Sequence, residues 1–434
     1  ATVTLGTAKS DHNRPLIPSP GMVAGRHLTV PAARTQLRER GTFLTPGENS
    51  MSVRLPASLP PQSLLARTAR AITPVDPRIR HEAHERQQIL TKPEGSLGLL
   101  ESLSEQLCAI YGQVPGPIPS HPVVGLFAGD HGVCAQGVSP DPQEITYQQA
   151  INMAAGGACV GVLTRQMGGK VIVTDVGILK DLPAGTGVVD RKIQHGTDDI
   201  SVGPAMSLDD AVTAFEVGIQ TGLDAIDGGA DTLVAGEMGI GNTTPAAALI
   251  ALFTGKPAKE VTGHGAGADE RRRAHKIAIV DKALAVNEPD AEDPVTAMAL
   301  VGGFELAAMA GLMLAGASRH VPVIIDGVLA CSAALTATAI APATLDHLVA
   351  GHAGAEPGIV AATEKLGLPA LLDLGMRLGE GSGAILAFPI VQAAAHIMAE
   401  MTTFDEVGVT DVKVTGETDF PGSAEAETSE DAAR

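Results

Sequence analysis

Short apolar, β-branched runs alternate along this chain with longer Ala-rich stretches, and this alternation constrains the fold more than any other feature. The runs expected to be strands are Pro122–Ala128, Lys170–Val176, Thr232–Ala235 and Val321–Ile325. The stretches expected to be helices include Leu208–Asp227, Thr243–Thr254, Ala268–Val286 and Val295–Ala317. Strands that alternate with helices predict an α/β fold with a doubly wound, mostly parallel sheet and flanking helices. In such folds ligands bind beyond the carboxyl ends of the strands.

The composition excludes one large class of partners. Of the 434 residues 44% are hydrophobic but only 2% are aromatic, and there are 50 Gly and no Trp. The core must therefore be aliphatic. Single-stranded nucleic acid is bound on aromatic faces, and any nucleic acid repels a chain with a net charge of −19. We expect no nucleic-acid partner.

The four cysteines lie far apart and form no C-x-x-C pair. This spacing argues against a disulfide scaffold and a structural zinc site, and favours a cytoplasmic location. We expect neither a metal nor a cofactor. No run approaches 18 uninterrupted apolar residues, so no membrane span is expected. The nearest run, Ala297–Ala317, contains Glu305 and is better interpreted as a buried helix.

Charge divides the chain unevenly. Residues 1–70 contain nine Lys and Arg against three Asp and Glu, a net charge of +6, so residues 71–434 carry −25. Residues 1–60 are rich in Pro, Arg, Ser and Thr without apolar periodicity, which predicts a flexible basic N-terminal extension. Residues 410–434 are predicted to form a solvated acidic tail, because Asp411–Arg434 has seven acidic residues against two basic ones.

The first candidate site is the Gly-rich segment Gly236–Thr244 (GEMGIGNTT), which follows an expected strand and opens an expected helix. Free backbone N–H groups at such a helix start can bind an anion. A tight turn between strand and helix is the default alternative. The acid Glu237 at the mouth of the turn favours a site.

The second segment, Thr262–Gly267 (TGHGAG), precedes a helix that carries Arg271, Arg272, Arg273 and Lys276. A glycine loop with cations on the next helix can hold a phosphate. We expect the three arginines to cover a solvated face. Lys276 lies one turn beyond Arg272 and is the cation that can face inward.

The third segment, Leu378–Ala384 (LGEGSGA), places Glu380 between apolar stretches. An acid in apolar surroundings has a raised pKa, which suits a general base or general acid. The same carboxylate could instead cap the helix that follows. The residues alone favour the two interpretations equally.

Several motifs together resemble those of one family, the nicotinate-nucleotide–dimethylbenzimidazole phosphoribosyltransferases of cobalamin assembly. The resemblance runs from about Ile72 to about Val409. The motifs are Thr91–Gly98 (TKPEGSLG), Leu126–Gly132 (LFAGDHG), Val138–Gln148 (VSPDPQEITYQ), Gly236–Thr244, Gly302–Glu305 (GGFE), Ile325–Gly327 (IDG), Gly351–Gly358 (GHAGAEPG) and Leu378–Ala384. Each motif alone is weak, but their order and spacing are highly specific.

The resemblance implies an architecture and a reaction. It implies an α/β domain over residues 111–409, plus a small helical domain whose N-terminal segment spans residues 61–110 and to which C-terminal helices can return. It also implies a homodimer. The reaction implied is transfer of phosphoribose from nicotinate mononucleotide to 5,6-dimethylbenzimidazole, with inversion at C1′. Nicotinate and α-ribazole 5′-phosphate are released.

The resemblance also assigns residue roles. Glu380 matches the family's general base, and the match places Glu237, Gly239 and Gly241 around the ribose phosphate together with Lys276. Gln148 and Leu378 fall at positions that contact the base, with Gly379 beside them. The acids that could support the site are Asp326, Glu305 and Glu356.

The chemistry of this reaction fits the expected absence of a metal. Nicotinate leaves from a pyridinium, so the leaving group already carries its positive charge. The attacking base must lose an N–H proton, for which one carboxylate with a raised pKa suffices. General-base assistance of this kind contributes about 10²–10⁴ in rate.

The chain departs from the family pattern near the expected subsites. The departures, with the family's usual residue in parentheses, are Glu94 (Pro), Leu99 (Arg), His264 (Arg), Ala266 (Thr), Gly354 (Ser) and Ile359 (His). They leave the preferred base open, so the same reaction on a phenolic or purine base is one alternative. A non-catalytic nucleotide-binding paralogue is another, although retention of Glu237, Lys276 and Glu380 argues against it. A dinucleotide-dependent oxidoreductase is disfavoured, since no G-x-G-x-x-G turn with a downstream acid is present.

Overall fold

The computed structural model describes residues 52–265, 267 and 269–410, and a six-stranded sheet lies at the centre of this part of the chain. All neighbouring strands are parallel, in the order β3-β2-β1-β4-β5-β6. The strands are β1 (Pro122–Gly129), β2 (Lys170–Gly177), β3 (Val189–Asp190), β4 (Thr232–Met238), β5 (Val323–Ile325) and β6 (Leu348–Ala350). The chain order reverses between β1 and β4, and ligands bind at the carboxyl end of such a switch point. The predicted doubly wound parallel sheet is confirmed.

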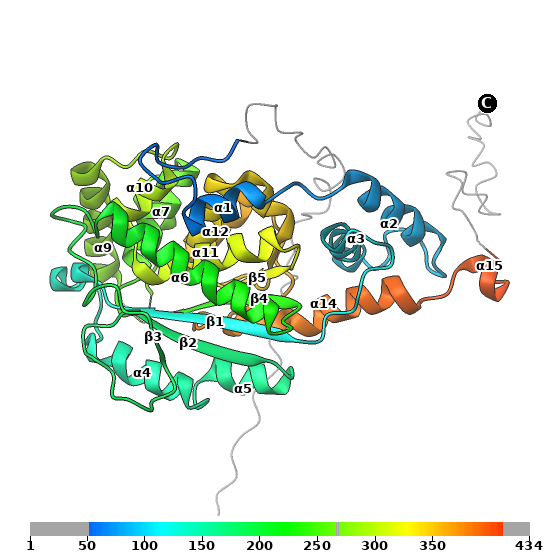
Figure 1. Ribbon diagram of the computed structural model, residues 1–434, viewed down its shortest axis with the longest axis horizontal. Coiled ribbons are helices and arrows are strands. Elements are labelled where there is room, and N and C mark those ends of the chain that lie inside the picture. Colours follow the sequence, from blue (N-terminus) through cyan, green and yellow to red (C-terminus); the bar gives the residue numbers. More distant parts are fainter. Residues whose placement is uncertain (1–51, 266, 268, 411–434) are drawn as a thin grey trace, which may run out of the picture. The chain divides into compact units, whose positions relative to one another are not determined.

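Helices cover both faces of the sheet (Figure 1). Alternate residues of β1 point to opposite faces: Val123 and Phe127 belong to one core cluster, Val124 and Leu126 to the other. The first face is covered by α6 (Leu208–Asp227), α11 (Phe304–Ser318) and α12 (Val328–Ile340), with α7 (Thr243–Thr254) and α10 (Pro294–Val301) packed on them. The second face is covered by α4 (Glu144–Ala154), α5 (Cys159–Gln166) and α14 (Ser382–Glu400).

The remaining helices pack around this layered body or extend from it. The α-helices are α1 (Leu64–Ala71), α2 (Pro77–Ile89), α3 (Leu99–Tyr111), α8 (Ala258–Val261), α9 (Glu270–Asn287), α13 (Pro357–Leu366) and α15 (Phe404–Val407). The 3-10 helices are η2 (Gly132–Gln136) and η3 (Pro342–His347). Helices α2 and α3 pack on each other and on α14, whereas α1 packs on α6 and α11 (Figure 1). The division into a large and a small domain stays a prediction.

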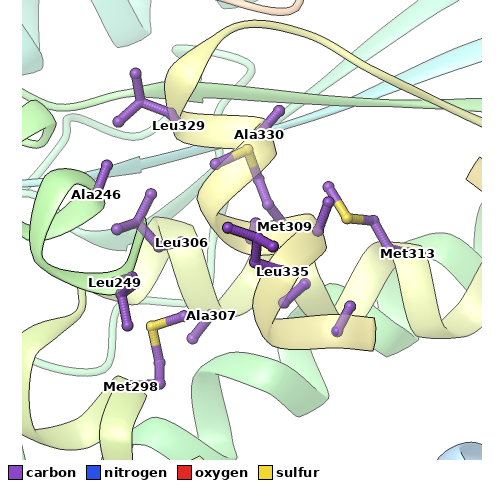
Figure 2. Packing of buried hydrophobic residues seen from close by; sticks show 14 of the residues in the cluster. Ala246, Leu249, Met298, Leu306, Ala307, Met309, Met313, Leu329, Ala330 and Leu335 are labelled. Atoms are coloured by element: carbon purple, nitrogen blue, oxygen red, sulfur yellow. The ribbon is translucent and has the colours of Figure 1, made fainter. Parts of the chain in front are cut away.

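The larger core cluster is aliphatic, as the composition predicts. Figure 2 shows Leu, Met and Ala side chains of α7, α10, α11 and α12 interlocking without an aromatic ring among the labelled residues. Each fully buried Leu or Met contributes about 1.5–3 kcal/mol relative to exposure. Phe127, Phe215, Phe304 and Phe388 are the aromatic side chains that are fully buried in the described residues.

Most predicted elements are present, with one clear error. Helices α6 and α7 occupy the predicted residues, but the single helix predicted over Val295–Ala317 is two helices, α10 and α11. The chain leaves the helical conformation at Gly302 and Gly303. Glycine costs about 1 kcal/mol in a helix interior relative to Ala, so a pair of glycines is a natural place for this break.

Residues 52–60 fall within the predicted flexible extension, yet they contact the body. The Arg54 N–H donates to the Ile340 carbonyl at 2.8 Å, and Val53, Leu55 and Leu59 pack against the core. The predicted boundary at residue 60 is therefore too late. Residues 1–51, and residues 411–434 of the predicted acidic tail, lie outside the described residues.

Helix α14 is the one helix in the described part of the chain that is long and apolar enough to cross a membrane by length and composition. In the structure 56% of that apolar window is buried inside the protein. Core helices of globular proteins have the same length and composition, and α14 packs on the sheet as they do.

Candidate active site

A cavity of about 270 Å³ opens at the carboxyl ends of the strands. Its walls come from the segments that follow β4, β5 and β6, together with residues 376–381, Lys276 of α9 and part of the segment 138–149. All three Gly-rich segments of the sequence contribute to it. The cavity therefore lies where the doubly wound topology predicts a ligand.

The cavity gathers most of the predicted site residues. Those that line it are Glu237, Gly239, Gly241, Lys276, Asp326, Glu356, Leu378, Gly379 and Glu380. Two predicted residues do not line it, Gln148 and Glu305.

The prediction for Gln148 needs correction. Its side chain is exposed on α4, and the next residue, Gln149, lines the cavity instead. A shift of one residue turns a helical side chain by about 100° around the axis. The motif alone did not resolve which of the two adjacent glutamines points inward.

Glu380 occupies a backbone conformation that is uncommon for a residue with a side chain. Its φ is +66°, between Gly379 at +88° and Gly381 at +87°. A Cβ on Gly379 would also lie 2.5 Å from Glu237 Oε1, so only glycine fits there. Left-handed conformations of this kind cost free energy and persist where the surroundings hold them, often at functional sites.

The Glu380 carboxylate is nearly buried, with 8% exposure. Burial raises its pKa, the nearby charge of Asp326 adds to this, and a hydrogen bond from the Val160 N–H opposes it. Val160 donates to Oε2 at 3.1 Å from the first turn of α5. The alternative that Glu380 caps the following helix is wrong, because its carboxylate accepts from α5, whereas Asp326 accepts the Gly381 and Ala384 N–H groups at the start of α14.

Glu237 links the first and third Gly-rich segments. Its Oε1 accepts the Glu380 N–H at 3.3 Å, and its Oε2 accepts the Asn242 amide at 2.5 Å. Burial raises the pKa of Glu237 to about 8, and the charge of Glu305 adds to the effect. This carboxyl group is therefore largely protonated near neutral pH.

Lys276 faces inward, as expected. It is 2% exposed and donates to Thr243 Oγ1 at 2.5 Å, at the start of α7. Burial lowers its pKa to about 8, and Glu356 opposes this. A buried cation beside a helix N-terminus without a side-chain cap is suited to an anion such as phosphate. None of the three arginines on α9 lines the cavity.

Glu356 and Asp326 both hold backbone rather than pointing freely into the cavity. Glu356 Oε1 accepts the Gly265 N–H at 2.8 Å and so ties the second Gly-rich segment to the start of α13. Asp326 accepts two N–H groups from the third segment and lies 3.2 Å from His352 Nε2. His352 belongs to the motif Gly351–Gly358, and nothing in that motif by itself distinguishes this histidine as a site residue.

Glu305 lies behind the cavity in a buried ion pair. Its Oε1 is 2.9 Å from His131 Nε2, and neither side chain is more than 1% exposed. Burial disfavours the charged imidazole, but the charge and hydrogen bond of Glu305 outweigh it and raise the pKa of His131. A Cβ on Gly239 would lie 3.2 Å from His131 Nε2, so the imidazole of this pair packs closely against the first Gly-rich segment.

Two departures from the family pattern, Gly354 and Ile359, lie against each other at the cavity. Ile359 lines the cavity, and a Cβ on Gly354 would overlap the Ile359 Cδ1 atom. His264 also lines the cavity and lies 3.1 Å from Glu270. Glu94 and Leu99 do not line it, which corrects the expectation that they border a subsite. Ala266 lies outside the described residues.

The fold and the site together define a class of enzyme. Residues 72–409 match the family model described as a phosphoribosyltransferase. Such a match agrees with a doubly wound sheet whose switch point carries a buried lysine, a helix start without a side-chain cap, and carboxyl groups.

Individual relatives narrow the class. The chain is 47% identical over 351 residues to the nicotinate-nucleotide–dimethylbenzimidazole phosphoribosyltransferase of Chloroflexus aggregans, covering 81% of this chain and 99% of the relative. It is 47% identical over 360 residues to the enzyme of the same name from Salinispora tropica, covering 80% and 99%. A crystal structure of that enzyme from Thermus thermophilus superposes with a TM-score of 0.73 at 41% identity, covering 77% of this chain and 99% of that one. The chain belongs to the nicotinate-nucleotide–dimethylbenzimidazole phosphoribosyltransferase family, which confirms the resemblance.

Proposed function

We propose that this chain transfers phosphoribose from nicotinate mononucleotide to 5,6-dimethylbenzimidazole, with inversion at C1′. The products are α-ribazole 5′-phosphate and nicotinate. The observation that carries the proposal is the nearly buried Glu380, held in a left-handed conformation in the same cavity as the buried Lys276. Family membership supports the choice of substrates.

The phosphate of the nucleotide would bind where Lys276 meets the start of α7. The Lys276 ammonium supplies the positive charge, and the first turn of α7 supplies backbone N–H groups. The protonated form of Glu237 limits the negative charge in the same cavity. This matters because an anionic substrate must enter a chain whose residues 71–434 carry −25.

Glu380 would act as the general base. Its carboxylate removes the N–H proton of the benzimidazole while the lone pair of the other ring nitrogen forms the new bond to C1′. The C1′–N bond to nicotinate breaks, and its electron pair neutralises the pyridinium nitrogen. A raised pKa suits this role, because the carboxylate is then basic enough to accept the proton as the bond forms. Positioning of the two reactants supplies the larger part of the acceleration.

The same reaction on a phenolic or purine base is the second candidate. The close approach of Gly354 and Ile359 favours it, because both replace polar side chains of the family pattern and Ile359 lines the cavity. An apolar wall at this place changes which edges of a planar base are accommodated without an unpaired polar group.

The test is release of nicotinate from nicotinate mononucleotide by the purified chain, with dimethylbenzimidazole, benzimidazole, adenine and a phenol offered separately and then in competition. We expect turnover with dimethylbenzimidazole, and a fall of at least about 100-fold in kcat for Glu380→Gln. Glu364→Gln is the matched control, since this carboxylate is exposed and pairs with Lys256 away from the cavity. Nucleotide binding by calorimetry without turnover on any base would contradict the proposal and indicate a non-catalytic paralogue.

The homodimer and the cytoplasmic location also stay proposals. All four cysteines lie among the described residues and all are free thiols, which supports a reducing compartment. The expectation that neither nucleic acid nor membrane is a partner stays a prediction.

A further inference from the structure

Asp326 caps a helix that belongs to a distant part of the chain. It directly follows β5 and is 4% exposed. Its Oδ2 accepts the Gly381 N–H at 3.2 Å and its Oδ1 accepts the Ala384 N–H at 2.8 Å. These are N–H groups at the start of α14, whose own N-cap residue is glycine and supplies no side chain. A carboxylate at this position satisfies free N–H groups and favours the positive end of the helix dipole.

Hydrogen bonds donated to the carboxyl groups of Asp326 and Glu237 hold the backbone at Glu380 and at the residue after it. Glu237 accepts the N–H of Glu380 itself, and Asp326 accepts the N–H of the next residue, Gly381. Three successive residues there, 379–381, have positive φ. A strained backbone of this kind keeps its conformation only when surrounding groups hold it, and these two carboxyl groups make those bonds.

His352 in turn orients Asp326. Its Nε2 lies 3.2 Å from Asp326 Oδ1, and both side chains are 4% exposed. The imidazole ring lies against α14, because a Cβ on Gly383 would overlap the ring. The ring is therefore confined between the Asp326 carboxylate and the backbone of the helix that Asp326 caps.

We propose that Asp326 is a positioning residue for Glu380: it holds the segment 379–384 in the conformation that places the carboxylate in the cavity, and His352 fixes the direction of the Asp326 side chain. The inference rests on the proposed function only in calling Glu380 the base. The contacts of Asp326 with segment 379–384 and with His352 do not depend on which substrate binds.

The charges around Glu380 predict how the contacts among Asp326, His352 and segment 379–384 should affect the pH dependence of kcat. The negative charge of Asp326 raises the pKa of Glu380, and the Val160 N–H at the start of α5 lowers it. Glu237 at the end of β4 and the exposed Cys159 of α5 are the other titratable groups near it. Removing the Asp326 charge should therefore move the acid limb of kcat to lower pH. Removing His352 leaves that charge less compensated and should move the limb to higher pH.

The experiment compares Asp326→Asn and His352→Gln with Asp175→Asn in the full chain. Asp175 is the matched control: it is 2% exposed at the end of β2 and accepts the Gly177 and Ile178 N–H groups, but it does not line the cavity. Two readouts are measured, amide hydrogen exchange of residues 378–384 and the pH dependence of kcat and KM for nicotinate mononucleotide.

We expect Asp326→Asn to speed exchange at Gly381 and Ala384 by about tenfold or more and to lower kcat by at least about tenfold, with KM changed less than about threefold. His352→Gln should speed exchange less and shift the acid limb in the opposite direction. Asp175→Asn should change neither readout.

Unchanged exchange in both cavity variants overturns the proposal, as does faster exchange with an unmoved acid limb. If the wild-type chain shows no turnover, the proposed function fails while exchange still decides the positioning role. If Asp326→Asn does not fold, His352→Gln decides it.

Discussion

At the scale of single residues, burial of Lys276 makes the charge that would hold the substrate phosphate depend on pH. An ammonium group that is 2% exposed and has one hydroxyl partner loses much of its hydration, so burial lowers its pKa from 10.5 to about 8. Glu356 opposes this shift. The cation that would hold the phosphate is therefore present at neutral pH and disappears within the range in which an enzyme can be assayed.

This gives a pH dependence with a definite sign. Below about pH 8 Lys276 is charged, and a bound phosphate favours that form and raises the pKa of the lysine further. The KM for nicotinate mononucleotide should therefore change little between about pH 7, where the phosphate is already a dianion, and pH 8. Above pH 8 it should rise by at least about tenfold per pH unit, because Glu237 loses its proton in the same range. Steady-state kinetics between pH 6 and 10 measure this. Lys276→Met should have a high KM that rises less steeply above pH 8, because only Glu237 still titrates there. Lys282→Met, a change at an exposed lysine of the same helix, should behave as wild type. A flat wild-type KM to pH 10 contradicts the assignment.

At the scale of the elements, an ion pair holds the start of α3. It joins Lys92 of the Thr91–Gly98 motif to Glu101 in the first turn of the helix. Lys92 Nζ lies 2.8 Å from Glu101 Oε1, with the two side chains 5% and 14% exposed. Glu101 also accepts the N–H groups of Gly95 and Leu97. Burial raises the pKa of Glu101, but the bonds from Lys92 and the two N–H groups outweigh this and lower it. The Thr91–Gly98 motif therefore forms a loop held against α3, the helix that packs on α14. None of the residues of the motif lines the cavity.

Removing the acid of this pair should destabilise the protein. Glu101→Gln leaves a buried ammonium without a charged partner, which should cost about 3 kcal/mol of unfolding free energy, the lower end for buried pairs because Glu101 keeps some exposure. Because the folded pKa of Glu101 is lowered, its contribution is present above the ordinary value of 4.5 and is lost as pH falls through the folded value. Urea unfolding at pH 7 measures the loss of unfolding free energy, and repeating it at pH 3 measures how that loss depends on pH. Adding Lys92→Met to Glu101→Gln should recover most of the loss. A double variant no more stable than the single one would refute the pairing.

At the scale of the whole molecule, the charge distribution opposes the substrate. The −19 total combines +6 on residues 1–70 with −25 on residues 71–434, and nicotinate mononucleotide is an anion. Local attraction comes from Lys276 and the start of α7, inside a cavity in which solvent ions screen little. The long-range field and the local site therefore act in opposite directions.

Salt separates these two contributions. Raising ionic strength from 0.01 to 0.15 M shortens the screening length from about 30 to about 8 Å, which weakens the repulsion of the whole chain more than the contact with Lys276. We expect kcat/KM for nicotinate mononucleotide to rise about twofold or more over this range. Dimethylbenzimidazole is uncharged, so its kcat/KM at saturating nucleotide is the internal control and should not change. A fall in kcat/KM for the nucleotide would show that local attraction governs association.

The sequence predicted more of the fold than of the site. Helices α6 and α7 were predicted at their observed bounds because apolar periodicity and glycine turns are local properties. The break at Gly302 and Gly303 was missed because Leu300, Val301 and Phe304 continue the apolar pattern across it. Gln148 was predicted although Gln149 lines the cavity, because a motif gives position along a helix but not the direction in which each side chain points.

By itself, the sequence determined the class of fold, the family and the chemical types of the site residues. These follow from patterns over a few to a few tens of residues, and from the order of motifs. Only the tertiary structure decided what each acid does: Glu380 accepts an N–H from α5, 220 residues away, Asp326 caps α14, and Glu305 pairs with His131 behind the cavity. Desolvation and charge set the pKa of a carboxyl group, and both depend on neighbours that are distant in the chain.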